Sequence, residues 1–313
     1  MSRGRLAFWW LLVFPLALLA LWGLFDDVVL FLKTFLNGLT LASLYFIVAS
    51  GFTLVFGLMR NVNLAHGSLF LVGAYVGWIV GDLTSSWLLA VLAGFISSAV
   101  FGVVIQIVVF RRMQGEDLRQ TLVTIGLSIV LADLMLWYFG GEIYTFDPPA
   151  WIYGTMSLPI IEKFPTYRII VLLIAIAIGL LLWGLLNGTR IGMMIRAGVD
   201  DRGMLSASGV NVQRIFALTF ALGAGLAGLA GVVGGTALSI SPGEDTRYLL
   251  ASLVVVIVGG MGSVPGAAIG ALLIGLAEQF GQAYAPTYSV VFTFVIMIIA
   301  LAFRPRGVLG KAT

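Results

Sequence analysis

The chain has 313 residues, of which 60% are hydrophobic and only 10% are charged, and its mean hydropathy is +1.09. A water-soluble core of this composition would lack the polar surface needed to cover it, so we predict a polytopic membrane protein. The net charge is +3, and the basic residues are too dispersed to indicate nucleic-acid binding. The absence of cysteine excludes disulfides, thiolate metal ligands and a cysteine nucleophile.

Ten apolar runs of roughly membrane-spanning length follow one another along the chain. They cover residues 7–25, 34–59, 64–82, 86–110, 120–139, 168–187, 215–240, 247–260, 264–283 and 288–304. The first run follows a basic start, as in a signal peptide, but at about 20 residues it is long enough to span a bilayer, and we interpret it as a retained extra span. The predicted fold is therefore an all-α bundle of about ten spans, in a single domain of residues 1–313.

Basic residues predict which side of the membrane each loop occupies, because Lys and Arg are retained in cytoplasmic loops. With the N-terminus inside, thirteen of the seventeen fall in cytoplasmic segments, which favours both termini in the cytoplasm. The four on the outside are Lys33, Lys163, Arg168 and Arg247. The longest outside loop, residues 140–167, is rich in aromatic residues, and we interpret it either as an aromatic belt or as a docking surface for an extracytoplasmic binding protein.

Polar or glycine-rich residues interrupt the apolar pattern once in each half of the chain, and the halves look like diverged copies of one unit. The first break contains Arg60, Asn61, Asn63, His66 and Gly67, and the second, around residues 259–265, contains Ser263. Irregular backbone at membrane depth survives only where it lines a cavity or is buried in protein, so paired breaks indicate a substrate path. A short cytoplasmic turn in each half is the alternative.

Three titratable residues stand inside or beside apolar runs. His66 is the only histidine, so a multi-histidine metal site is excluded and we predict no metal. Its expected role is a hydrogen-bonded imidazole that holds the first break together, with a substrate or gating contact as the alternative. Asp133 and Glu278 lie within spans, where ionisable groups are costly and are expected to face the bundle interior. Of the two, Asp133 is the stronger candidate for the substrate path.

The longest polar run between apolar segments covers residues 188–214 and is expected in the cytoplasm. Asp200 or Asp201 can cap a short helix that begins near Arg202, and Gly209 is placed to end it. The helix would have about two turns. Held between two long spans, it is predicted to act as a rigid lever.

Four stretches resemble the permeases of branched-chain amino acid ABC importers, specifically the H-type subunit. They are 37–57 (NGLTLASLYFIVASGFTLVFG), 63–67 (NLAHG), 189–231, and 259–275 (GGMGSVPGAAIGALLIG) together with the tail FRPRGVLG. NLAHG is similar to the family's Asn-Phe-Ala-His-Gly motif, with Leu64 in place of the usual Phe, and it favours the H-type over the sister M-type subunit. The resemblance covers most of the chain from about residue 34.

The resemblance implies a bacterial inner-membrane importer that contains two permease subunits, two ATPases and a soluble extracytoplasmic binding protein. The second permease would be an M-type sister or another copy of this chain. Residues expected at the ATPase contact are Asp200, Asp201, Arg202, Ala207 and Gly209. The chain lacks the G-x-x-x-x-G-K-[ST] phosphate loop, so we predict a transport subunit without enzyme activity or cofactor, with ATP used by its partners.

Other functions stay open at this point. Members of the same family also carry urea, short amides and aromatic acids, and the permease sequence does not separate these. An autonomous ion-coupled transporter would use Asp133 or Glu278 to bind its coupling ion. An intramembrane enzyme is disfavoured, because the chain has no histidine pair, no cysteine and no clustered carboxylates.

Overall fold

The computed structural model describes residues 27–59, 62–304 and 307–310. The predicted first span at 7–25, and Arg60 and Asn61 in the first break, lie outside the described residues. The helices are α2 (Val28–Met59), α3 (His66–Thr84), α4 (Trp87–Ile105), α5 (Asp117–Phe139), α6 (Thr166–Gly188), α7 (Arg190–Asp200), α8 (Arg202–Ala207), α9 (Val212–Leu238), α10 (Glu244–Gly259), α11 (Val264–Tyr284) and α12 (Ser289–Phe303). A π-helical turn (Gln106–Phe110) extends α4, and a 3₁₀ turn (Pro286–Tyr288) precedes α12.

The all-α multi-pass architecture is confirmed. Within the described residues, seven helices are long and apolar enough to cross a membrane, namely α2, α3, α4 with its π turn, α5, α6, α9 and α11. The predicted count of ten is not confirmed. With 16 residues, α10 is about 24 Å long, which is less than the roughly 30 Å hydrocarbon core. With 15 residues, α12 is shorter still.

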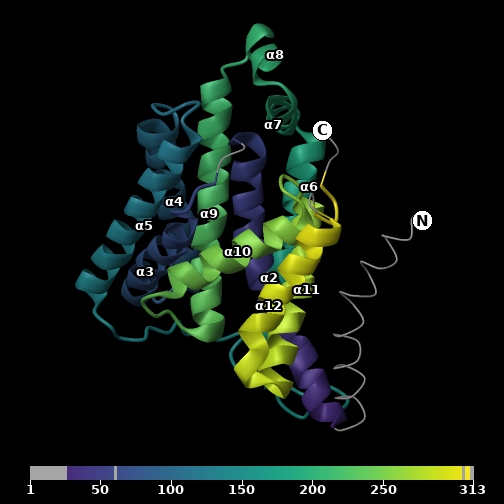
Figure 1. Cartoon of the computed structure of the whole chain (residues 1–313). Coiled ribbons are helices and arrows are strands. Elements are labelled where there is room, and N and C mark those ends of the chain that lie inside the picture. Colours follow the sequence, from purple (N-terminus) through teal and green to yellow (C-terminus); the bar gives the residue numbers. More distant parts are fainter. Residues whose placement is uncertain (1–26, 60–61, 305–306, 311–313) are drawn as a thin grey trace.

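The bundle has two distinct ends (Figure 1). The upper end carries α7 and α8, and the lower end carries the loop between α5 and α6. α2 runs from the lower end to the upper end, whereas α9 runs in the opposite direction, and α10 lies obliquely across the bundle. The predicted span at 247–260 is therefore a tilted, incomplete crossing.

Helix contacts relate α2–α5 to α9–α12 as two copies of one unit in opposite orientations. α4 packs along α9, and correspondingly α11 packs along α2. α3 packs on α9, and correspondingly α10 packs on α2. The first helix of one copy is antiparallel to that of the other (Figure 1), so the predicted repeat is present as an inverted repeat.

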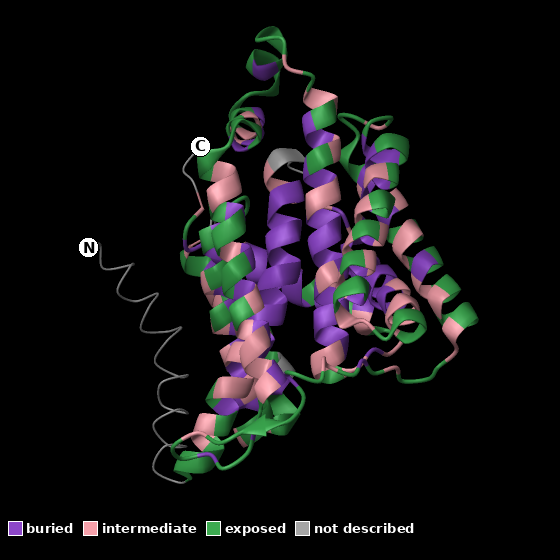
Figure 2. Cartoon of the chain, turned by 180° about the vertical axis from the view of Figure 1, so that it is seen from behind, coloured by how far each residue is buried: buried purple, intermediate pink, exposed green. Residues whose placement is uncertain are grey.

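The core lies at the centre of the bundle and is formed mainly by the buried residues of α2 and α9 (Figure 2). Small residues let the helices approach closely, as in other membrane bundles. A Cβ on Gly73 of α3 would stand 2.1 Å from the Cα of Gly228 in α9. A Cβ on Gly275 of α11 would stand 2.5 Å from the backbone nitrogen of Ala42 in α2. Close glycine contacts thus hold α3 against α9 and α11 against α2.

The lower-end loop is folded back onto the bundle. Its short strands β1 (Thr155–Met156) and β2 (Phe164–Pro165) pair antiparallel. The backbone of Tyr144 pairs with that of Ile240, just after α9. The loop is thereby fixed to both halves of the molecule.

Candidate functional site

The first break lies inside the bundle. The backbone nitrogen of Leu64 donates to Thr124 Oγ1 at 3.3 Å, and the hydroxyls of Ser68 and Ser128 are 2.8 Å apart. Ser128 is the middle residue of α5, so the chain turns into α3 at the level of the middle of a spanning helix. The alternative of a cytoplasmic turn is therefore wrong for this break.

His66 and Asn63 are fully buried in this break. The imidazole Nε2 of His66 donates to the carbonyl oxygen of Val48 at 3.1 Å, and the ring packs edge-on against Phe52. The Oδ1 of Asn63 accepts from the backbone nitrogen of Ala65 at 3.2 Å. Within the described residues, His66 Nδ1 and Asn63 Nδ2 have no hydrogen-bond partner. The geometry is that of a structural imidazole, and contact with a transported solute stays a prediction.

The second predicted break is a turn at the upper end. A Cβ on Gly57, near the upper end of α2, would lie 3.0 Å from the Cα of Gly262. The chain after α12 covers the turn, since the backbone nitrogens of Val308 and Leu309 each donate at 2.9 Å to the last carbonyls of α10. Ser263 Oγ accepts from the backbone nitrogen of Gly266 at 3.1 Å and caps α11. Ser263 thus lies at this end, apart from the internal break that holds Asn63 and His66, and its place on the substrate path stays a prediction.

The stretch that matches the first break in the inverted repeat is residues 239–243, which precede α10. α3 and α10 begin side by side: a Cβ on Gly67 would stand 2.1 Å from the carbonyl oxygen of Asp245 and 2.8 Å from the Cβ of Leu249. α3 and α10 thus begin at the same place inside the bundle rather than at its surface. Discontinuous helices that meet near the midplane form the solute sites of many transporters.

Sequence reasoning missed a cluster of charged residues at the start of α10. Arg247 Nη2 lies 3.2 Å from Glu278 Oε1 of α11, and Nη1 lies 3.5 Å from Glu244 Oε2. Glu278 also accepts from the hydroxyl of Tyr45 at 2.6 Å. The positive-inside count had assigned Arg247 to an outer loop. The spacing of Glu244 and Arg247, three residues apart at a helix start, was the available signal.

Asp133 is not part of this site. It lies on the exposed side of α5, so the expectation that it faces the bundle interior is wrong. α5 stands at the edge of the bundle and packs mainly against α3, which leaves most of its circumference uncovered (Figure 1). Within the described residues, no group of three or more acidic or histidine side chains is placed to hold a metal ion.

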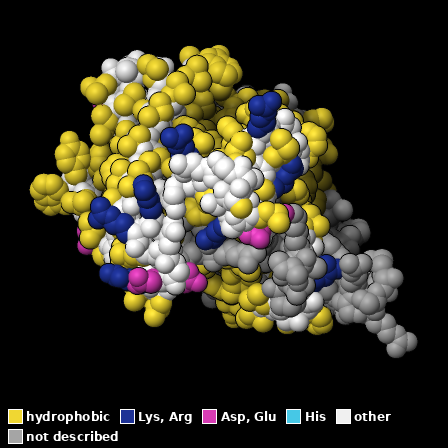
Figure 3. Space-filling model, turned by 90° about the horizontal axis from the view of Figure 1, so that it is seen from above, with side chains coloured by type: hydrophobic (Ala, Val, Ile, Leu, Met, Phe, Trp, Pro, Cys, Tyr) yellow, Lys and Arg dark blue, Asp and Glu magenta, His cyan; other side chains and the backbone are white. Residues whose placement is uncertain are grey.

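The predicted short helix is confirmed as α8. Its N-cap is Asp201, whose carboxylate accepts from the backbone nitrogen of Met204 at 3.0 Å, and Gly209 follows the helix with φ of +83°. All the residues expected at the ATPase contact are exposed: Asp200, Asp201, Arg202, Ala207 and Gly209. Seen from above, Lys and Arg are spread across this end of the molecule (Figure 3).

The sequence did not predict α7, which connects α8 firmly to the bundle. Ile195 of α7 is buried against Ile215 and Phe216 at the start of α9. The guanidinium of Arg202 lies 5.1 Å from the centre of the Phe216 ring, within the range of a cation–π contact. A force applied to α8 is therefore transmitted to α9, one of the two central helices.

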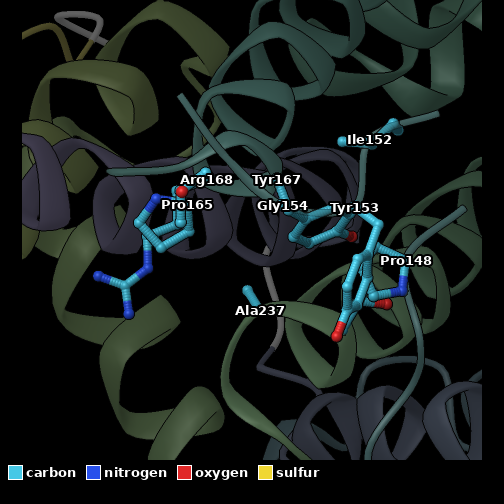
Figure 4. Close-up of a pocket in the computed structure, with 10 residues that line it drawn as sticks. Pro148, Ile152, Tyr153, Gly154, Pro165, Tyr167, Arg168 and Ala237 are labelled. Atoms are coloured by element: carbon cyan, nitrogen blue, oxygen red, sulfur yellow. The ribbon is translucent and has the colours of Figure 1, made fainter. Parts of the chain in front are cut away.

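A cavity of about 350 Å³ opens at the lower end. Pro148 and Tyr153 of the loop lie on one side of it, and Pro165 and Arg168 at the start of α6 lie on the other (Figure 4). Arg168 is held in place by a hydrogen bond to the side chain of Asn37 in α2. The cavity lies at the opposite end of the molecule from α8.

An inverted helical repeat in which α3 and α10 begin side by side inside the bundle defines a multi-pass membrane transport protein. The chain belongs to the family described as branched-chain amino acid transport system, permease component, whose family model matches residues 34–301.

Known relatives agree with this family. The high-affinity branched-chain amino acid transport system permease protein BraD of Pseudomonas aeruginosa is 34% identical, over 90% of this chain and 96% of the relative. LivH of Escherichia coli K12, with the same descriptive name, is 31% identical over the same shares. The ribose import permease protein RbsC of Escherichia coli K12 is 30% identical over 78% of this chain and 76% of its own length. No solved structure matches.

Proposed function

We propose that this chain is a permease subunit of an ATP-driven importer for branched-chain amino acids or related small polar solutes. It works in the bacterial inner membrane, with both termini in the cytoplasm. Separate subunits bind and hydrolyse ATP, so the chain itself carries no cofactor. A sister permease or a second copy completes the transmembrane path, and a soluble binding protein delivers the solute at the lower end.

The observation that carries the proposal is the exposed α8. A capped helix that projects beyond the bundle and is packed onto α9 through α7 has the form of a lever for a partner protein. Its basic surroundings match the cytoplasmic side, where ATPase subunits are located. ATP-driven closure of the ATPases would move α8, and α9 would pass the motion to α3 and α10.

The test is co-purification from the native membrane. Wild type is compared with a variant in which Asp200, Asp201 and Arg202 are changed to Ala, and proteins are identified by mass. Wild type is expected to retain ATPase subunits and the variant to lose them. A control variant with Glu162 and Lys163 of the lower-end loop changed to Ala should retain them, because those residues lie at the opposite end.

Two results would overturn the proposal. In the first, the wild-type preparation contains no ATPase subunits, and the chain alone takes up solute in vesicles without ATP. This would establish an ion-coupled transporter. ATPase subunits retained by the triple variant would exclude α8 as their contact.

Gly209 provides a second test of the lever. Its φ of +83° is unfavourable for β-branched residues, so Gly209→Val should uncouple uptake from ATP hydrolysis while the protein stays in the membrane. Gly188→Val is the matched control, because a Cβ there meets nothing within 4 Å. Full uptake by the Gly209 variant would count against the lever.

The amino-acid substrate is favoured by the relatives that cover most of the chain, BraD and LivH, whose names state branched-chain amino acids. RbsC, whose name states ribose, covers less of the chain. Uptake assays with leucine, ribose and urea, each with its own binding protein, would separate the solutes. Uptake of ribose or urea without leucine uptake would contradict this assignment.

A further inference from the structure

The charged residues at the start of α10 lie near the middle of the membrane. Tyr45, which donates to Glu278, is next to Phe46 in α2. The Phe46 ring lies 3.4 Å from the position of a Cβ on Gly179, which is near the middle of α6. Glu244, Arg247 and Glu278 therefore stand at about half the depth of a spanning helix.

These charges are open on one side of the molecule. The side chain of Arg247 is 42% exposed, that of Glu244 is 24% exposed, and that of Glu278 is 15% exposed. Thr246 and Leu250 on the same face of α10 are also exposed. A charge exposed to lipid at this depth is strongly unfavourable, whereas a charge that faces water is tolerated. A water-filled path along the open face of α10 would meet this requirement.

The cluster has both kinds of charge that an amino acid requires. The Arg247 guanidinium donates one hydrogen bond to Glu278 and also lies 3.5 Å from Glu244. A guanidinium carries five N–H groups, so donors remain on its open side for a carboxylate. Glu244 and Glu278 together carry one more charge than Arg247 neutralises, which favours an ammonium group. A solute with adjacent carboxylate and ammonium groups complements this arrangement, and an uncharged sugar does not.

We propose that Glu244, Arg247 and Glu278 bind the charged backbone groups of a zwitterionic α-amino acid as it passes through a water-filled path along α10. The guanidinium of Arg247 pairs with the solute carboxylate, and the carboxylates of Glu244 and Glu278 pair with its ammonium group. This inference rests on the proposed import function and identifies residues in this chain that recognise the solute.

The first experiment tests for water, and it exploits the absence of cysteine from the chain. Leu250→Cys places a thiol one turn from Arg247 on the open face, and Leu181→Cys places one on the outer face of α6 at a similar depth. In membranes that contain the full complex, a charged, membrane-impermeant thiol reagent should label position 250 and leave position 181 unlabelled. No labelling at 250, or equal labelling at both positions, would overturn the water-filled path.

The second experiment tests the charges in the reconstituted complex with leucine-loaded binding protein. Arg247→Gln and Glu278→Gln should each lower leucine uptake at least about tenfold, the usual loss when a hydrogen bond to a charged group is removed. ATP hydrolysis stimulated by the loaded binding protein should stay within about twofold, because α8 is unchanged. Uptake at the wild-type rate in both variants would overturn the proposal.

A charge exchange separates solute binding from a purely structural ion pair. The variant Arg247→Glu, Glu278→Arg is combined with Glu244→Gln so that no two carboxylates are placed in contact. It keeps opposite charges between α10 and α11, so it would restore uptake if the pair only held the two helices together. We expect uptake to stay impaired, because each charge would face the wrong group of the solute. Restored uptake would overturn the proposal.

The controls distinguish the failure of this inference from that of the proposed function. A wild-type complex that imports no amino acid would contradict the proposed function itself. If the wild-type complex and the charge variants all import leucine, only the binding role of the cluster is contradicted. If charge variants fail to assemble, labelling at position 250 still tests the water-filled path on which the binding role depends, because Leu250→Cys leaves all three charges intact.

Discussion

The two breaks predicted from the sequence differ in almost every physical respect. The first is inside the bundle at the level of Ser128, and its polar side chains, His66 and Asn63, are fully buried. The second is at the upper end, its turn is formed largely of glycine, and Met261 is 51% exposed there. Two similar interruptions of the apolar pattern thus correspond to different structures. At one, a helix begins inside the bundle; the other is a turn at the surface.

The difference shows that a break is defined by what covers its backbone. In the first break Asn63 and Ala65 are buried, so side chains and neighbouring helices must satisfy the backbone groups there. In the second break, backbone groups can bond to solvent, and the backbone nitrogens of Val308 and Leu309 donate to the carbonyls that precede the turn. Substitutions in the two breaks should accordingly differ in cost, and four of them test the comparison.

Gly67→Val should have the largest effect. Its Cβ would stand 2.1 Å from the backbone oxygen of Asp245, so either α3 or α10 must shift. We expect a loss of about 3 kcal/mol in stability. Thermal unfolding of the detergent-solubilised protein measures this. Gly126→Val on α5 is the matched control, because a Cβ there meets nothing within 4 Å. Equal unfolding temperatures for the two variants would contradict the close contact of α3 and α10.

His66→Ala should rank second. It leaves the Val48 carbonyl without its donor and removes the ring from Phe52, for a combined loss of about 2–4 kcal/mol. His66→Gln retains a donor at a similar distance and should recover part of the loss in the same unfolding assay. If Ala and Gln were equally mild, the imidazole would not be holding the break together.

Gly260→Ala should be milder, because it affects the surface turn. Its φ of +110° is unfavourable for Ala, and its Cβ would stand 2.4 Å from the backbone nitrogen of Gly310, so we expect about 1–2 kcal/mol and release of the chain after α12. Limited proteolysis should cleave that segment faster. Met261→Ala, at an exposed position in the same turn, should leave cleavage unchanged.

Ser263→Ala should have the smallest effect, about 1 kcal/mol, because it removes only the N-cap of α11. Ser263→Asn, which supplies another capping oxygen, should restore stability. Leucine uptake by the reconstituted complex should be close to wild type in both. A large loss of uptake in the Ala variant with unchanged stability would mean that Ser263 contacts the solute after all.

Features set by neighbours in the sequence were predictable. Asp201, Arg202 and Gly209 lie within one short segment, and their cap, helix and left-handed end were read correctly, because each depends on local hydrogen bonds and local φ. The family was likewise visible in its motifs. The repeat, however, was matched to the wrong elements: the sequence paired the first break with the turn before α11, whereas the structure pairs it with the start of α10.

Features set by contacts between distant segments were not predictable. Arg247 is paired with Glu278 of another helix, and the Glu244–Arg247 spacing signals only the contact within α10. Asp133 was assigned to the interior on the cost of burial in lipid, but the position of α5 at the edge of the bundle depends on how the other helices pack. The tilt of α10 likewise depends on how the other helices pack.

The contact of Gly67 with Asp245 also has a consequence for biosynthesis. The two residues are about 180 positions apart, so at about 5–20 residues per second the first break waits roughly 10–40 s for the helix that covers it. During that interval a polar turn stands within the nascent bundle without its neighbour. A ribosome that stops after α9 would leave it permanently uncovered, which makes such truncated chains natural targets for membrane proteases.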